Sequence, residues 1–179
     1  METRQSSSET EGSSLARSLA SEIERGARVV SAIGAEAYRQ ESTKAGSIGV
    51  HIRHNLDLID CFLRGIGKGE VDYTARQRDT DIESDAAAAA ARTRALAEQL
   101  AAVEGRESEP VRVGSEIDHD ILHESTVGRE LEFLHCHTVH HHALIAERLR
   151  AMRIETESNF GVAPSTLRFW RNEAAAGGR

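Results

Sequence analysis

The stretch that decides the fold is VGRELEFLHCHTVHHHALIAERLRAM, residues 127–152. Its apolar residues recur every three or four positions, which is the spacing of one face of an α-helix. This spacing predicts a long helix, with Ser125 just before it as a candidate N-cap. The apolar positions are Val127, Leu131, Leu134, Val139, Leu144, Ile145, Leu149 and Met152.

Three further segments show helical spacing of apolar residues upstream of this stretch. They cover residues 14–40, 47–66 and 81–103, with Ser47 as a candidate N-cap of the second. Four long helices with short connections predict an all-α fold, a four-helix bundle. The weak alternation of residues 111–122 around Gly114-Ser115 is compatible with a short β-hairpin before the last long helix.

The two ends of the chain differ in composition from this helical region. Residues 1–12 are Ser, Thr, Glu and Gly with little to bury, so we expect a disordered tail. The bundle is expected to span 13–155, and 156–179 to form a C-terminal extension. Pro164 could open a short helix there, and we expect its Leu167, Phe169 and Trp170 to cap the bundle.

The composition restricts the classes of partner. A net charge of −7 argues against binding to the phosphate backbone of nucleic acids. The sequence has neither an apolar stretch approaching the roughly 20 residues of a membrane helix nor an N-terminal signal-peptide pattern, so we expect no membrane association. Cys61 and Cys136 are too few for a disulfide scaffold, which favours a reducing, cytoplasmic location.

Histidines are numerous and clustered. The chain has nine, and five of them lie between residues 135 and 142. His137 and His141 have i,i+4 spacing and share a stripe with Leu134 and Ile145, so both point toward the bundle interior. Buried imidazoles without partners are costly, and a metal ion would remove that cost. The five are His135, His137, His140, His141 and His142.

A stable metal site needs a third ligand from another helix. The second helix offers His51 and His54, and its periodicity favours His51 by a small margin without deciding between them. A buried histidine is more often a hydrogen-bonded core residue, and a histidine-rich patch is often solvated. We therefore expect surface positions, or hydrogen bonds to ligands, for the remaining histidines of the last helix: His135, His140 and His142.

Two stretches, SIGVHIRHNLD at 47–57 and FLHCHTVHHHALI at 133–145, resemble the DinB/YfiT-like superfamily. The resemblance covers most of residues 14–155. It implies an up-down four-helix bundle that holds one divalent metal through three histidines, one on the second helix and two in a His-x-x-x-His on the last. Matching the motifs selects His54, His137 and His141, and makes His51 a candidate to hydrogen-bond a ligand. Homodimers are an expectation from the same resemblance.

The resemblance also implies a function. Some relatives are metal-dependent thiol transferases and others look like hydrolases, so the chain is expected to act on a small molecule. Zinc, nickel and iron all suit histidine-only sites. The alternative is a non-catalytic or stress-related protein with a structural metal. A di-iron carboxylate site is disfavoured because Glu132 with His135 is the only Glu-x-x-His spacing on the four helices.

Four residues are candidates for roles around the metal. Asp57, one turn from His54, and His51 could serve as a general base. For Asp57 we favour a hydrogen bond to a ligand, or a surface position. Arg76 could bind an anionic substrate, as could Arg78, although such arginines more often pair with nearby carboxylates, here Asp79, Asp81 or Glu83.

Overall fold

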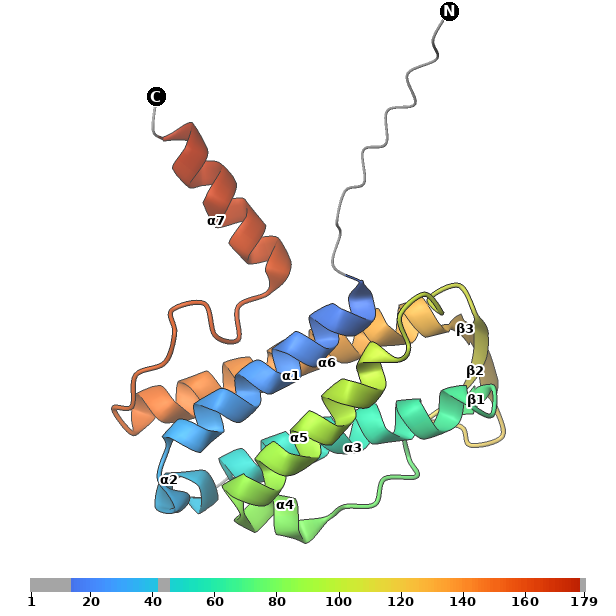
Figure 1. Ribbon diagram of the computed structural model, residues 1–179, viewed down its shortest axis with the longest axis horizontal. Coiled ribbons are helices and arrows are strands. Elements are labelled where there is room, and N and C mark those ends of the chain that lie inside the picture. Colours follow the sequence, from blue (N-terminus) through green and yellow to red (C-terminus); the bar gives the residue numbers. More distant parts are fainter. Residues whose placement is uncertain (1–13, 42–45, 178–179) are drawn as a thin grey trace, which may run out of the picture.

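The computed structural model describes residues 14–41 and 46–177. The tail expected to be disordered, residues 1–12, lies outside these ranges. Within them the chain is mostly helical and carries one small three-stranded sheet (Figure 1). The predicted helical class is therefore confirmed, and the strands extend beyond the expected hairpin.

Four long helices form the body of the protein. They are α1 (Leu15–Ala32), α3 (Ile48–Ile66), α5 (Ala86–Ala101) and α6 (Val127–Ala151). α1 and α3 each pack against both α5 and α6, and the four lie side by side in Figure 1. Burial of their apolar faces is the main stabilising contribution. The fully buried side chains include Leu19, Ile59, Phe62, Leu96, Leu100, Leu131, Leu134, Ile145 and Leu149.

Two of the expected helices are interrupted. The segment 14–40 divides into α1 and the short α2 (Ala35–Arg39), and the segment 81–103 divides into α4 (Thr80–Ser84) and α5. The second break is at Asp85, whose backbone is extended and whose carboxylate accepts a hydrogen bond from the N–H of Ala87. Asp85 therefore acts as an N-cap, which favours a new helix over continuation of the old one.

The helices that carry the clustered histidines begin at hydroxyl caps. Ser47 accepts a hydrogen bond from the N–H of Val50 and caps α3, as predicted. α6 is capped by Thr126, which accepts from the N–H of Arg129 at 3.2 Å. The predicted cap, Ser125, is wrong by one residue, because its hydroxyl donates to Glu130 instead.

The sheet has the strand order β1 (Glu70–Val71), β2 (Pro110–Gly114) and β3 (Leu122–Thr126). β2 and β3 are antiparallel and form the expected hairpin, but its turn covers residues 115–121 instead of Gly114-Ser115. β1 pairs with β2 in parallel. All three strands gather at one end of the long helices (Figure 1).

The C-terminal helix α7 (Pro164–Ala176) stands away from the other helices (Figure 1). None of its residues is buried, and Phe169 and Trp170 are 59% and 50% exposed. The expectation that these side chains cap the bundle is therefore wrong. The buried aromatic residue of the C-terminal region is Phe160, which stacks on His142 of α6. In the part of the chain that the structure describes, no helix combines the length and apolarity needed to cross a bilayer.

Candidate metal centre

The candidate site lies where the middle of α3 faces the middle of α6. His54 is on α3, and His137 and His141 are one turn apart on α6. Beside them, Oγ1 of the buried Thr138 lies 3.1 Å from Oδ1 of Asn55, and the same hydroxyl lies 2.8 Å from the carbonyl oxygen of Leu134. Asn55 and Thr138 therefore meet where α3 packs against α6. The three imidazole rings come together at the same level of the two helices.

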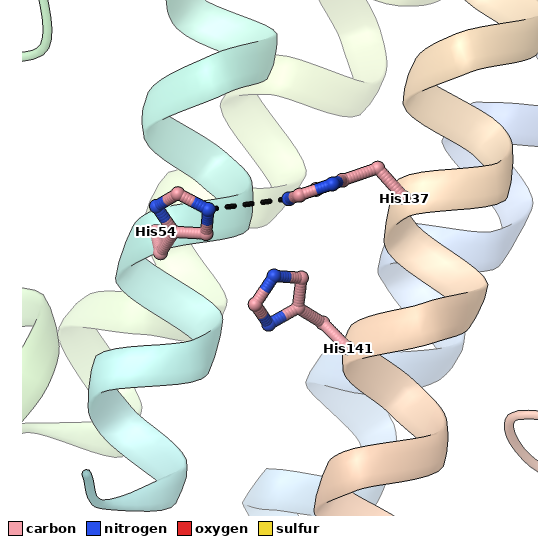
Figure 2. Close-up of side chains that lie close together, drawn as sticks. All are labelled: His54, His137 and His141. Atoms are coloured by element: carbon pink, nitrogen blue, oxygen red, sulfur yellow. Dashed lines mark hydrogen bonds between the residues drawn. The ribbon is translucent and has the colours of Figure 1, made fainter. Parts of the chain in front are cut away.

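The three rings converge closely. Nε2 of His54 lies 3.2 Å from Nε2 of His137. The ring centroid of His141 is 4.6 Å from that of His137 and 4.9 Å from that of His54. One nitrogen from each ring lies within 4.8 Å of the other two. Figure 2 shows the rings turned toward one another across the space between the two helices. These three histidines are close enough to bind a metal ion.

The surroundings keep the three rings uncharged. Burial, together with the nearby positive charge that His54 would carry, lowers the pKa of His137 to about 4. Burial, followed by the charges of His137 and His54, lowers the pKa of His141 to about 3. The pKa of His54 is also lowered, first by burial and then by the adjacent Arg76. Neutral imidazoles are the form that binds metals, so the surroundings favour the metal-binding form of these three rings.

The donor set fits a divalent ion. Two nitrogens that bind the same zinc at about 2.0–2.1 Å with tetrahedral angles lie about 3.3 Å apart. The distance of 3.2 Å between Nε2 of His54 and Nε2 of His137 matches this spacing. Three imidazoles and no carboxylate suit zinc, nickel or iron and do not select among them.

His51 lies behind the group on the same helix as His54. Its Nδ1 is 3.1 Å from Nδ1 of His141, and its side chain is buried. This contact occupies the nitrogen of His141 that points away from the other two rings (Figure 2). A hydrogen bond at the outer nitrogen orients a ligating histidine and fixes which nitrogen carries its proton. His51 is therefore placed to orient His141.

Arg76 contacts the opposite side of the group. Its Nη1 lies 3.1 Å from Nδ1 of His54. Of the two arginines predicted to bind an anion or to pair with carboxylates, Arg76 is thus placed at the histidines. Arg78 is an exposed residue of the same loop. His54 and Arg76 are 22 positions apart, and Arg76 lies in a loop without periodic spacing, so no sequence signal marks this contact.

Asp57 lies elsewhere. Its Oδ2 accepts a hydrogen bond from Nη1 of Arg53 at 3.0 Å, and Nε of Arg53 also donates to Glu83 at 2.7 Å. Asp57 is buried, so the expected surface position is wrong, and it pairs with Arg53 instead of with a histidine of the group. Arg53 therefore joins α3 to α4 through Glu83, and Asp57, one turn along α3, holds the guanidinium in place.

The other histidines of α6 lie outside the group of three. His142 is buried, its Nδ1 lies 2.7 Å from Oε1 of Glu22 on α1, and its expected surface position is wrong. His140 is exposed, and His135 is half-buried. His140 lies closest to the site, with its ring centroid 5.5 Å from that of His141.

A pocket of about 580 Å³ opens beside the histidines. His54, His137 and Arg76 line it, together with apolar side chains and residues 113–117 from the end of β2 and the following turn. Sequence reasoning did not identify the apolar lining as functional. Leu58 of α3, Tyr73 after β1 and Phe133 of α6 form this lining, and they meet only after folding.

Comparison of the chain with protein-family models, curated proteins and solved structures gave no match. The geometry of the three histidines and their surroundings is therefore the basis for inferring a function.

Proposed function

We propose that this protein binds one divalent metal ion through His54, His137 and His141 and uses it as an enzyme acting on a small molecule. The observation that carries the proposal is the convergence of three neutral imidazoles, from two helices, within 4.8 Å of one another. The pocket that reaches His54 and His137 supports a catalytic role over a buried structural one.

We also propose that the chain is a member of the DinB/YfiT-like superfamily, with a four-helix bundle at residues 13–155 and a C-terminal extension at 156–179. Two observations support this. α1, α3, α5 and α6 pack in the pairs that a four-helix bundle requires. The two motifs that carry the resemblance, 47–57 and 133–145, lie on α3 and α6 and face each other through their histidines.

The proposed reaction class is hydrolysis or thiol transfer. A divalent ion held by neutral ligands keeps its full charge and lowers the pKa of a water molecule or thiol, which makes a nucleophile near pH 7. The protein's own residues position the ligands and the substrate. His51 orients His141. The pocket admits a small molecule to the side of His54 and His137. The second candidate function is metal binding without catalysis.

Metal analysis of purified variants tests the proposal. After loading with zinc and desalting, we expect one zinc per chain in the wild type and at least a tenfold lower content in His54→Ala, His137→Ala and His141→Ala. His135→Ala is the matched control, because His135 is on α6 but outside the group of three, and it should keep its zinc. Circular dichroism checks that each variant is folded.

Each other outcome has a defined meaning. A wild type without stoichiometric zinc, nickel or iron would overturn the proposal. Zinc retained in His54→Ala but lost in His51→Ala would assign the ligand on α3 to His51. A metal-loaded protein that turns over neither ester and amide substrates nor thiol acceptors, relative to a chelator-treated control, would favour metal binding without catalysis.

A further inference from the structure

The contact between Arg76 and His54 fixes the position of a proton. A guanidinium group has N–H donors and no acceptor. At 3.1 Å from Nη1 of Arg76, Nδ1 of His54 must therefore be the acceptor. The neutral ring then carries its proton on Nε2, the nitrogen that lies 3.2 Å from Nε2 of His137. Arg76, His54 and His137 thus form a chain of hydrogen bonds in which His54 donates to His137.

The spacing of the two nitrogens suits a metal ion, but a proton on Nε2 of His54 and a metal ion bound to that atom exclude each other. A metal ion bound between His54 and His137 needs the lone pair of His54 Nε2, which here carries a proton. The ring can remain neutral only if Nε2 releases its proton to solvent and Nδ1 takes one up. Nδ1–H and the guanidinium would then both be donors, so Arg76 has to leave His54. The repulsion between a divalent ion and the guanidinium acts in the same direction.

Arg76 lacks the partner that would normally neutralise it. Its Nε is buried without a hydrogen bond, and the contact with His54 involves only Nη1. No ion pair within the described ranges includes Arg76. Two carboxylates line the same pocket. That of Glu130 accepts hydrogen bonds from Tyr73 at 2.9 Å and from Ser125 at 2.6 Å. Glu116 lies on the exposed turn after β2 and forms no ion pair with Arg76 in the described ranges. A guanidinium displaced from His54 can therefore pair with an anion from solution.

The pocket indicates which anions fit. Arg76 lines it next to His54 and His137, and a second cation, Arg129, lies on its wall. Leu58, Tyr73 and Phe133 add an apolar surface, and the volume of about 580 Å³ is that of a site for a small organic molecule. These features favour an organic anion whose charged group meets Arg76 while its apolar part lies against the aromatic rings.

We propose that, when the metal binds, the guanidinium of Arg76 leaves His54 and pairs with the anionic group of a small organic ligand. The metal and the anion therefore bind cooperatively. The inference rests on the proposed metal site and adds the substrate class. In the metal-free protein Arg76 competes with the ion for His54. In the loaded protein the same guanidinium binds the anion. By linkage, the anion must raise the affinity for the metal by the same factor as the metal raises the affinity for the anion.

Calorimetric zinc titrations of the folded protein test this exchange. Arg76→Gln removes the competing charge, and we expect it to bind zinc about tenfold more tightly than the wild type. Arg78→Gln is the matched control, an exposed arginine of the same loop, and it should stay within twofold of the wild type. Benzoate should tighten zinc binding at least threefold in the wild type and in Arg78→Gln. Benzoate should not tighten zinc binding by Arg76→Gln. The neutral analogue benzamide should not tighten zinc binding by the wild type or by either variant.

The results that overturn the inference differ from those that overturn the metal site. If Arg76→Gln weakens zinc binding, Arg76 supports the ligand and does not compete with the ion. If benzoate tightens zinc binding equally in Arg76→Gln, the anion binds without Arg76. Either result leaves the metal site standing, whereas no zinc binding by any variant overturns the proposed function and this inference together. Arg76→Met, which keeps an unbranched apolar side chain, replaces Arg76→Gln if circular dichroism shows that variant to be unfolded.

Discussion

The burial of neutral His141 predicts how acid affects the metal-free protein. Its pKa is about 3 in the folded chain, against an ordinary value of 6.5. Between these values the unfolded chain binds a proton that the folded chain does not. The contribution of His141 to stability is therefore fully present above pH 6.5 and is lost as the pH falls. Each pH unit in this window changes the free energy of unfolding by about 1.4 kcal/mol, so lowering the pH from 7 to 5 costs about 2 kcal/mol.

Urea denaturation after chelator treatment, at pH 7 and at pH 5, measures this loss. In His141→Gln, which has no proton to gain, the loss should be smaller than in the wild type by about 2 kcal/mol. His119→Gln changes an exposed histidine and should show the same loss as the wild type. Equal losses in His141→Gln and the wild type would refute the reasoning, because they would show that burial of this ring does not oppose its protonation.

Two further substitutions test the packing around the site. In a helix interior, alanine is normally more stable than glycine by about 1 kcal/mol. A Cβ at Gly26 of α1, however, would overlap with Nε2 of the buried His142, so Gly26→Ala should lower the free energy of unfolding by about 1–3 kcal/mol. Gly34→Ala is the control, because its Cβ meets open space and should cost no stability; a stabilised Gly26→Ala would contradict the close approach of α1 to α6. Asp57→Ala leaves Arg53 with one of its two carboxylates and should cost about 1–3 kcal/mol in urea denaturation. Its zinc content should stay at one per chain, and a loss of zinc from the folded variant would place Asp57 in the metal site instead.

Periodicity predicted the positions of the long helices because their buried faces are long and regular. It could not choose between His51 and His54, which are three residues apart and both face α6. The choice depends on the register of α3 against α6, which places His54 beside His137 and Asn55 beside Thr138. Helix spacing contains no information on that register. The resemblance of the two motifs singled out His54, the residue that the structure places beside His137.

The errors of the sequence analysis have local physical causes. Asp85 lies within a segment whose composition predicts one continuous helix. Its side chain instead caps a new helix, which separates α4 from α5. The C-terminal aromatics Phe169 and Trp170 suggested a buried helix, but Phe160 takes the buried position against His142. The contact of Arg76 with His54 follows from the path of a loop, which has no periodic pattern to read.

The most direct test of the metal centre is a crystal structure of the zinc-loaded protein with anomalous data collected at the zinc absorption edge. We predict one strong anomalous peak, at about 2.0–2.1 Å from a nitrogen of each of His54, His137 and His141. A peak bound elsewhere, or one that contacts fewer than these three rings, would contradict the account.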